Sequence, residues 1–177
     1  SSDLALANRK RLLLLKLLFE QSGKTVEQLA VCAGMKQCLT SLYLRQLQAR
    51  GLAMVVREGR YVYYRVQANP SIPETSDLVR ALRTVLIKRR WELDNVITVL
   101  TGFTHPRRVA LIAELHDDVR SRSELCSACD MSLRALDRHL RKLQDRGLVR
   151  PTDEAEANWR LLKPRDVLTR TLVACCR

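Results

Sequence analysis

Leucine residues recur with a helical period between Ser132 and Val149. Steps of three, four and three residues place them on one stripe of a helix: Leu133, Leu136, Leu140 and Leu143. The opposite face is mostly basic: Arg134, Asp137, Arg138, Arg141 and Lys142. Ser132 is a suitable N-cap residue, and Gly147 can end a helix in the left-handed conformation. The pattern predicts an amphipathic helix that is followed by a strand from Leu148.

The N-terminal part of the chain contains similar helical patterns. Residues 4–19 are predicted to form a helix with leucines on one face, although Asn8 interrupts that face. Thr25, with Gln28 three residues later, has the spacing of a capping box, in which each side chain bonds to the backbone N–H of the other residue. This spacing predicts a short helix from Val26 to Cys32.

A longer helix and a β-hairpin are predicted next. The helix runs from Lys36 to Arg50 and ends at Gly51. Between Leu52 and Val66, two runs rich in β-branched and aromatic residues flank Glu58-Gly59, which favours a tight hairpin turn. Two basic residues lie at the tip of this hairpin: Arg57 and Arg60.

A third predicted helix follows a proline-containing break. Thr75 or Ser76 can cap a helix that runs to about Leu100, and its apolar residues hold close to a seven-residue repeat that Arg89 interrupts. We interpret it as a packing or dimerisation helix, or alternatively as a helix that only covers the cores of the two halves. This interpretation divides the chain into residues 1–70, 71–104 and 105–177.

The rest of the sequence resembles the first part in its order of elements. One helix is predicted over Arg108–Leu115, and a second over Arg122–Ala128 with Ser121 and Glu124 as its capping box. Beyond the leucine-striped helix, a further strand and a terminal helix are predicted: Trp159–Leu162 and Asp166–Cys175.

An internal repeat relates the two halves. With a shift of 96 positions, Thr25–Leu52 aligns with Ser121–Leu148 without a gap, and Leu29, Met35 and Leu44 match identical residues. Each half is predicted to contain three helices and a hairpin, which is the order of a winged helix-turn-helix. The predicted fold is mainly α with small β-hairpin wings, as two tandem winged helix-turn-helix domains joined by a long helix.

The charge of the chain favours a polyanionic partner. The net charge of +12 and the pI of about 10.0 indicate nucleic acid before a membrane surface. Aromatic residues make up only 5% of the chain, which is few for a surface that stacks single-stranded bases. Six irregularly spaced cysteines indicate a reducing, cytoplasmic environment. The sequence lacks a phosphate-binding loop and a catalytic triad pattern, so we expect neither an enzyme nor a cofactor.

Three segments resemble ArsR-type transcriptional repressors. Phe103–Leu115 is similar to the opening helix of that family, Asp137–Val149 to its recognition-helix signature, and Arg57–Val66 to its wing. The resemblance implies a DNA-binding regulator, expected to be a repressor, that acts on a palindromic operator. Its partners would be double-stranded DNA and either a second copy, as a homodimer, or the other half of the same chain, as a pseudo-dimer.

The predicted DNA contacts lie on two helices and at the first hairpin tip. They are Lys36, Gln37, Thr40, Ser41, Arg45, Arg57, Arg60, Ser132, Arg134, Arg138, His139 and Arg141. Basic side chains at these places can neutralise phosphates or donate to base edges. A solvated helix face is the alternative for Arg45 and Arg141, and a semi-buried helix position is the alternative for His139.

The two halves depart from the ArsR-type pattern in different places. The resemblance puts Arg138 and His139 at groove-facing positions, where the first half has Leu42 and Tyr43. The second hairpin is acidic and would repel phosphates; its carboxylates are Asp153, Glu154 and Glu156. The second half therefore has the better recognition helix, and the first half has the better wing.

Two other classes of function remain open. A tandem winged-helix module for protein–protein interaction, of the chromosome-organising kind, is favoured by the acidic second hairpin and by apolar residues on a helix face: Leu39, Leu42 and Tyr43. A thiol or metal sensor is favoured by the C-x-x-C spacing of Cys126 and Cys129. However, Ser121 and Ser123 stand where the ArsR-type pattern has its metal-binding cysteines, and we expect no metal site.

Overall fold

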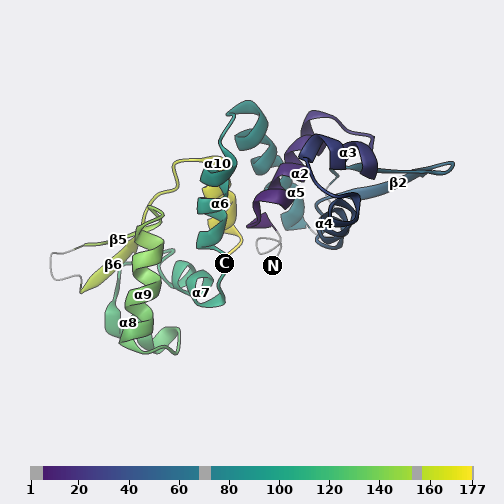
Figure 1. Cartoon of the computed structure of the whole chain (residues 1–177). Coiled ribbons are helices and arrows are strands. Elements are labelled where there is room, and N and C mark those ends of the chain that lie inside the picture. The colour runs from purple at the N-terminus through teal and green to yellow at the C-terminus, as the bar shows by residue number, and fades with distance from the viewer. Residues whose placement is uncertain (1–5, 68–72, 153–156, 177) are drawn as a thin grey trace. The chain divides into compact units, whose positions relative to one another are not determined.

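The computed structural model describes residues 6–67, 73–152 and 157–176, and it divides into two compact units (Figure 1). Unit 1 comprises Ser1–Leu100, and unit 2 comprises Thr101–Arg177. Each unit combines helices with a three-stranded antiparallel sheet. Within the described part of the chain, no helix has both the length and the apolar character that crossing a membrane requires.

Unit 1 begins with a helix, a short strand and two further helices, which a hairpin follows. Its elements are α2 (Arg9–Glu20), β1 (Lys24–Thr25), α3 (Val26–Ala33), α4 (Gln37–Ala49), β2 (Met54–Glu58), β3 (Tyr61–Arg65), α5 (Pro73–Arg83), the π-helix η1 (Thr84–Lys88) and α6 (Leu93–Gly102), whose last two residues belong to unit 2. β3 lies between β1 and β2. α2, α3 and α4 pack on one another through fully buried leucines, which include Leu15, Leu29 and Leu44.

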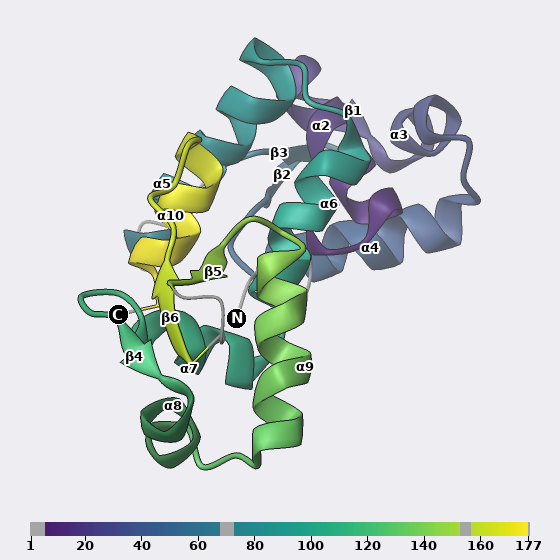
Figure 2. The ribbon, with the colours of Figure 1, turned by 90° about the vertical axis from the view of Figure 1, so that its left-hand side faces the viewer.

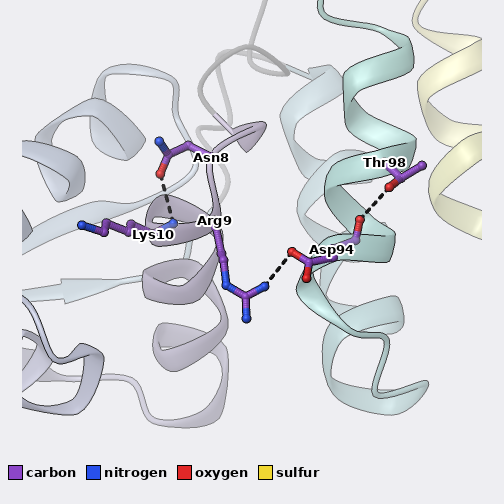
Figure 3. A network of polar contacts seen from close by, with 5 residues as sticks. All are labelled: Asn8, Arg9, Lys10, Asp94 and Thr98. Atoms are coloured by element: carbon purple, nitrogen blue, oxygen red, sulfur yellow. Dashed lines mark hydrogen bonds and ion pairs between the residues drawn. The ribbon is translucent and has the colours of Figure 1, made fainter. Parts of the chain in front are cut away.

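The start of α2 differs from the prediction, because Asn8 caps this helix instead of interrupting it. Its side-chain oxygen accepts hydrogen bonds from the backbone N–H groups of Lys10 (3.0 Å) and Arg11 (3.2 Å), and its own backbone is extended. A single helix that continues through Asn8 is therefore wrong, and α2 begins at Arg9. Figure 3 shows this cap together with the 2.6 Å ion pair between Arg9 and Asp94, which joins α2 to α6 within unit 1.

The first capping box and the hairpin are confirmed. The hydroxyl oxygen of Thr25 accepts from the backbone N–H of Gln28 at 3.3 Å, and the Gln28 side-chain oxygen accepts from the backbone N–H of Thr25 at 2.9 Å. β2 and β3 pair in antiparallel register, and Gly59 at their turn has φ +59°. A positive φ at this position favours glycine, because a side chain there would clash with the backbone.

The long helix predicted between residues 76 and 100 is wrong. The segment forms α5, then η1, then a break at residues 89–92, then α6, and α5 already begins at Pro73 rather than at a Thr75 or Ser76 cap. Arg90 takes the left-handed conformation with φ +51°, and the backbone N–H of Trp91 donates to the carbonyl of Val85. The wide π turn and the left-handed residue stop the helix, so one straight helix cannot join the two halves.

Unit 2 has the same order of elements as the first six elements of unit 1. They are α7 (Pro106–Glu114), β4 (Arg120–Ser121), α8 (Arg122–Ala128), α9 (Leu133–Gln144), β5 (Val149–Pro151) and β6 (Asn158–Leu161), followed by α10 (Val167–Ala174). β6 lies between β4 and β5, as β3 lies between β1 and β2. The second capping box, formed by Ser121 and Glu124, is confirmed. The acidic residues predicted for the second hairpin, 153–156, lie outside the described residues.

A buried arginine, Arg108, stabilises the first residues of unit 2. The Arg108 guanidinium donates to the carbonyl oxygens of Gly102 (3.0 Å) and Thr101 (2.6 Å), and to the hydroxyl of Thr104 (3.1 Å). The carbonyl groups of Thr101 and Gly102 lie in the last turn of α6, where no further helical N–H group is available to donate to them. The arginine therefore satisfies acceptors that burial would otherwise leave unpaired. This anchor fixes the start of α7 within unit 2.

Candidate nucleic-acid interface

α9 presents the most concentrated positive charge on a single helix of unit 2. It packs against α7, α8 and β5 (Figure 2), and its buried side chains are Leu136, His139, Leu140 and Leu143. The outward face of α9 exposes four cationic side chains: Arg134, Arg138, Arg141 and Lys142. Two carboxylates lie among them, Asp137 and Asp145, so the net charge of this face remains positive. A polyanion can bind to this face while the apolar core of unit 2, on the other side of α9, stays covered.

The two edges of the leucine stripe on α9 differ from the prediction. Leu133 is 57% exposed, whereas His139 is only 2% exposed. At 100° per residue, both lie at the margins of the stripe that Leu136, Leu140 and Leu143 define. The packing of the neighbouring elements therefore decides that the histidine is buried and the leucine is not.

His139 contacts the ring of His105 and not solvent. The two ring centroids are 4.6 Å apart, and neither ring nitrogen of His139 has a hydrogen-bond partner. Burial, with further repulsion from His105 and Arg138, lowers the pKa of His139 to about 4. The ring is therefore neutral near pH 7, and its prediction as a DNA contact is wrong; the alternative of a helix residue turned into the protein describes it better.

α9 is tied to the preceding helix by an ion pair. The guanidinium of Arg122, the first residue of α8, donates to the carboxylate of Asp137 on α9. At the start of α9, the Ser132 side chain accepts from the backbone N–H of Ala135 at 3.4 Å. The ion pair links α8 to α9, and the Ser132 cap stabilises the start of α9. No local pattern in the sequence pointed to Arg122.

The segment from Phe103 to Thr152 contains α7, α8, α9 and β5, with a short turn at residues 129–132 between α8 and α9. Residues 103–152 match a protein-family model described as a helix-turn-helix domain. In this motif the second helix enters the major groove of duplex DNA, and that helix is α9 here. The match makes DNA the indicated partner of this domain and covers only a part of unit 2. No curated protein and no solved structure matches the chain.

α4 occupies the place in unit 1 that α9 occupies in the helix-turn-helix domain, but its surface is different. Its exposed residues include a single cation, Arg45, together with uncharged residues: Gln37, Cys38, Leu42, Gln48 and Ala49. Of the predicted contacts at its start, Lys36 and Gln37 are exposed and Ser41 is half-buried. Thr40 is fully buried and donates to the carbonyl of Lys36 at 3.1 Å, so its prediction as a DNA contact is wrong.

The hairpin of unit 1 keeps both predicted arginines exposed. Arg57 lies on β2 near the turn, and Arg60 lies in the turn itself. The Arg60 guanidinium sits over the Tyr61 ring, 5.1 Å from its centroid, and donates to the Tyr61 hydroxyl at 2.9 Å. Glu58, the nearby carboxylate, pairs with Arg65 at 3.4 Å instead. The two arginines therefore leave a positive tip that can meet phosphates.

The cysteine pair of α8 is poorly suited to hold a metal ion. Burial, followed by the nearby Glu114, raises the pKa of the Cys129 thiol, which disfavours the thiolate that binds metals. Cys126 and Cys129 form no disulfide. Over residues 6–67, 73–152 and 157–176, no group of three or more His, Cys, Asp or Glu side chains is placed to bind a metal ion.

Proposed function

We propose that this chain is a sequence-specific regulator of transcription that binds double-stranded DNA with α9 as its recognition helix. The observation that carries the proposal is the exposed cationic face of α9, with Arg134, Arg138, Arg141 and Lys142, on the second helix of a helix-turn-helix domain. The excess of basic residues in the whole chain supports the same partner. Helix-turn-helix domains bind DNA rather than catalyse reactions, so the function is one of recognition.

In the proposed complex, α9 lies in the major groove. Its first two turns face the base edges, where Arg134 and Arg138 can donate to guanine, and Arg141 and Lys142 neutralise phosphates at the groove wall. Arg57 and Arg60 at the hairpin of unit 1 add contacts to the backbone. The ion pair between Arg122 and Asp137 already links α8 to α9 without DNA.

The finer proposal is an ArsR-like repressor with two tandem winged helix-turn-helix units in one chain. The gap-free alignment between the halves and their common order of elements support it. Residues 1–70 and 105–177 would be the two winged-helix domains, and residues 71–104 would connect them. On DNA, a homodimer or a pair of units from one chain would bind two half-sites.

Selection of bound sequences from random duplex DNA tests the proposal. We expect one preferred sequence, and an affinity that falls steeply as the salt concentration rises. The variant with Arg134→Gln and Arg138→Gln should lose at least about tenfold in affinity for that sequence, because each arginine–base contact contributes roughly 1–3 kcal/mol. Arg170→Gln is the matched control, since it removes an exposed arginine from α10. A binding constant that is independent of both salt and sequence would contradict the proposal.

A second candidate function concerns α4 alone. Leu42 is 43% exposed in the middle of a face that carries one cation, which suits a protein partner better than a phosphate backbone. Unit 1 would then serve protein–protein interaction while unit 2 binds DNA. Sedimentation of the Leu42→Gln variant tests this: a lower mass in solution with unchanged DNA affinity supports self-association through α4, and an unchanged mass counts against it.

A further inference from the structure

We infer that Leu133 determines part of the DNA sequence preference by contacting the 5-methyl group of a thymine. The inference rests on the proposed function of α9. Leu133 is the first residue of this helix, and its side chain is 57% exposed, although the other leucines of the stripe are buried. An apolar side chain at this place cannot contact phosphate favourably or read a hydrogen-bonding pattern.

The direction of the side chain follows from its position in the first turn. Cα–Cβ bonds in an α-helix tilt toward the N-terminus, so the first side chain projects beyond the end of the helix rather than onto the preceding turn. The Ser132 cap holds this turn in place. In the helix-turn-helix motif, the N-terminal residues of the second helix contact base edges, and Leu133 is therefore placed at the floor of the groove.

In the major groove, an apolar side chain such as Leu133 has a single class of group to contact. The thymine methyl is the apolar group that the bases present there, and the other base edges present hydrogen-bond donors and acceptors. Arg134 and Arg138, which are exposed on the same helix, can donate to guanine but gain nothing from a methyl group. Leu133 and these arginines therefore recognise complementary parts of one sequence.

The equivalent position of unit 1 supplies the test substitution. The gap-free alignment places Gln37 of α4 opposite Leu133, and Gln37 is also exposed at the first position of its helix. Glutamine has nearly the helix propensity of leucine, so Leu133→Gln changes the polarity of the site with little effect on the helix. Val31→Gln is the control, because it removes an apolar residue that is 78% exposed on α3 and that has no part in the proposed interfaces.

The experiment uses the full chain and the duplex that it selects from random DNA. Each thymine is replaced in turn by deoxyuridine, which removes the 5-methyl group and keeps every hydrogen-bonding atom. We expect one such replacement per half-site to weaken binding of the unsubstituted protein about fourfold, the effect of losing one buried methyl. In Leu133→Gln the same replacement should change the affinity less than about twofold, whereas Val31→Gln should keep the full effect.

Four results would overturn the inference. Binding could be insensitive to every thymine methyl, the fourfold effect could survive in Leu133→Gln, or it could also be lost in Val31→Gln, which would show that the effect is not specific to Leu133. A fourth, a change in the mass of Leu133→Gln in solution, would make Leu133 a subunit contact instead. Failure of the proposed function looks different, since the unsubstituted protein would then select no sequence at all.

Discussion

Single residues on α9 have roles that depend on which neighbour covers them. His139 is buried against His105 and lies near three cations, Arg107, Arg108 and Arg138, and its ring nitrogens lack hydrogen-bond partners. A protonated imidazolium at this place would be both desolvated and repelled. The ring therefore acts as an apolar core side chain that also carries a titratable group, and unit 2 should be sensitive to acid for this reason.

Replacing His139 tests this sensitivity. The pKa of His139 is lowered to about 4 in the folded protein from an ordinary value of 6.5, so the unfolded chain binds the proton more readily. The free energy of unfolding is then fully retained above pH 6.5 and falls as the pH drops toward 4. Allowing for solvent screening, we expect a loss of about 1–2 kcal/mol between pH 7 and pH 5, and a smaller loss in His139→Leu.

Chemical denaturation of both proteins at the two pH values measures the effect. His105 titrates nearby, and burial also lowers its pKa, so the comparison with His139→Leu is needed to isolate the buried ring. An equal loss of stability in both proteins would assign the acid sensitivity to other groups.

Among the helices and strands, the helix ends were the features that the sequence could predict best. Capping boxes are closed within four residues, so Thr25 with Gln28 and Ser121 with Glu124 could be identified without knowing the tertiary structure. Arg89 interrupts the apolar repeat at the break before α6, but the break itself could not be predicted, because it depends on a π turn and on Arg90 in the left-handed conformation, which no residue type there favours.

At the candidate interface too, local features could be predicted from the sequence and features that depend on tertiary packing could not. The basic face of α9 could be predicted from the helical period of its leucines alone, since the face opposite a buried stripe is exposed without needing a particular partner. The edges of the stripe could not, because the exposure of Leu133 and the burial of His139 depend on the elements packed against α9. Thr40 lies on the buried face of α4, which the sequence could not predict for the same reason.

Asn8 provides a test of capping at the start of α2. Its side chain accepts from two backbone N–H groups that have no other helical partner. We expect Asn8→Ala to lower the free energy of unfolding by about 1 kcal/mol, and Asn8→Asp to lower it much less, because aspartate keeps the acceptor. Thermal unfolding followed by circular dichroism measures both. Equal losses in the two variants would show that the cap does not stabilise α2.

At the scale of the whole molecule, two units with one order of elements carry different surfaces. α9 exposes four cations, and α4 exposes one cation on a face that also includes Leu42. A repeat in which both copies bound DNA equally would be expected to keep the charge on both helices. The difference supports a division in which α9 provides the groove contact and unit 1 provides phosphate contacts from its hairpin.

Arg45 and Arg141 allow this division to be measured, because the internal alignment places them at equivalent positions of α4 and α9 and both are exposed. If α9 alone enters a groove, Arg141→Gln should weaken DNA binding about fivefold and reduce the slope of affinity against salt by about one ion, whereas Arg45→Gln should change the affinity less than about twofold. Fluorescence anisotropy over a series of salt concentrations gives both quantities.

Equal effects of the two substitutions would mean that both helices contact the duplex, so that each chain spans two half-sites. A larger effect of Arg45→Gln would assign the groove to α4 and would leave the cationic face of α9 without its proposed partner.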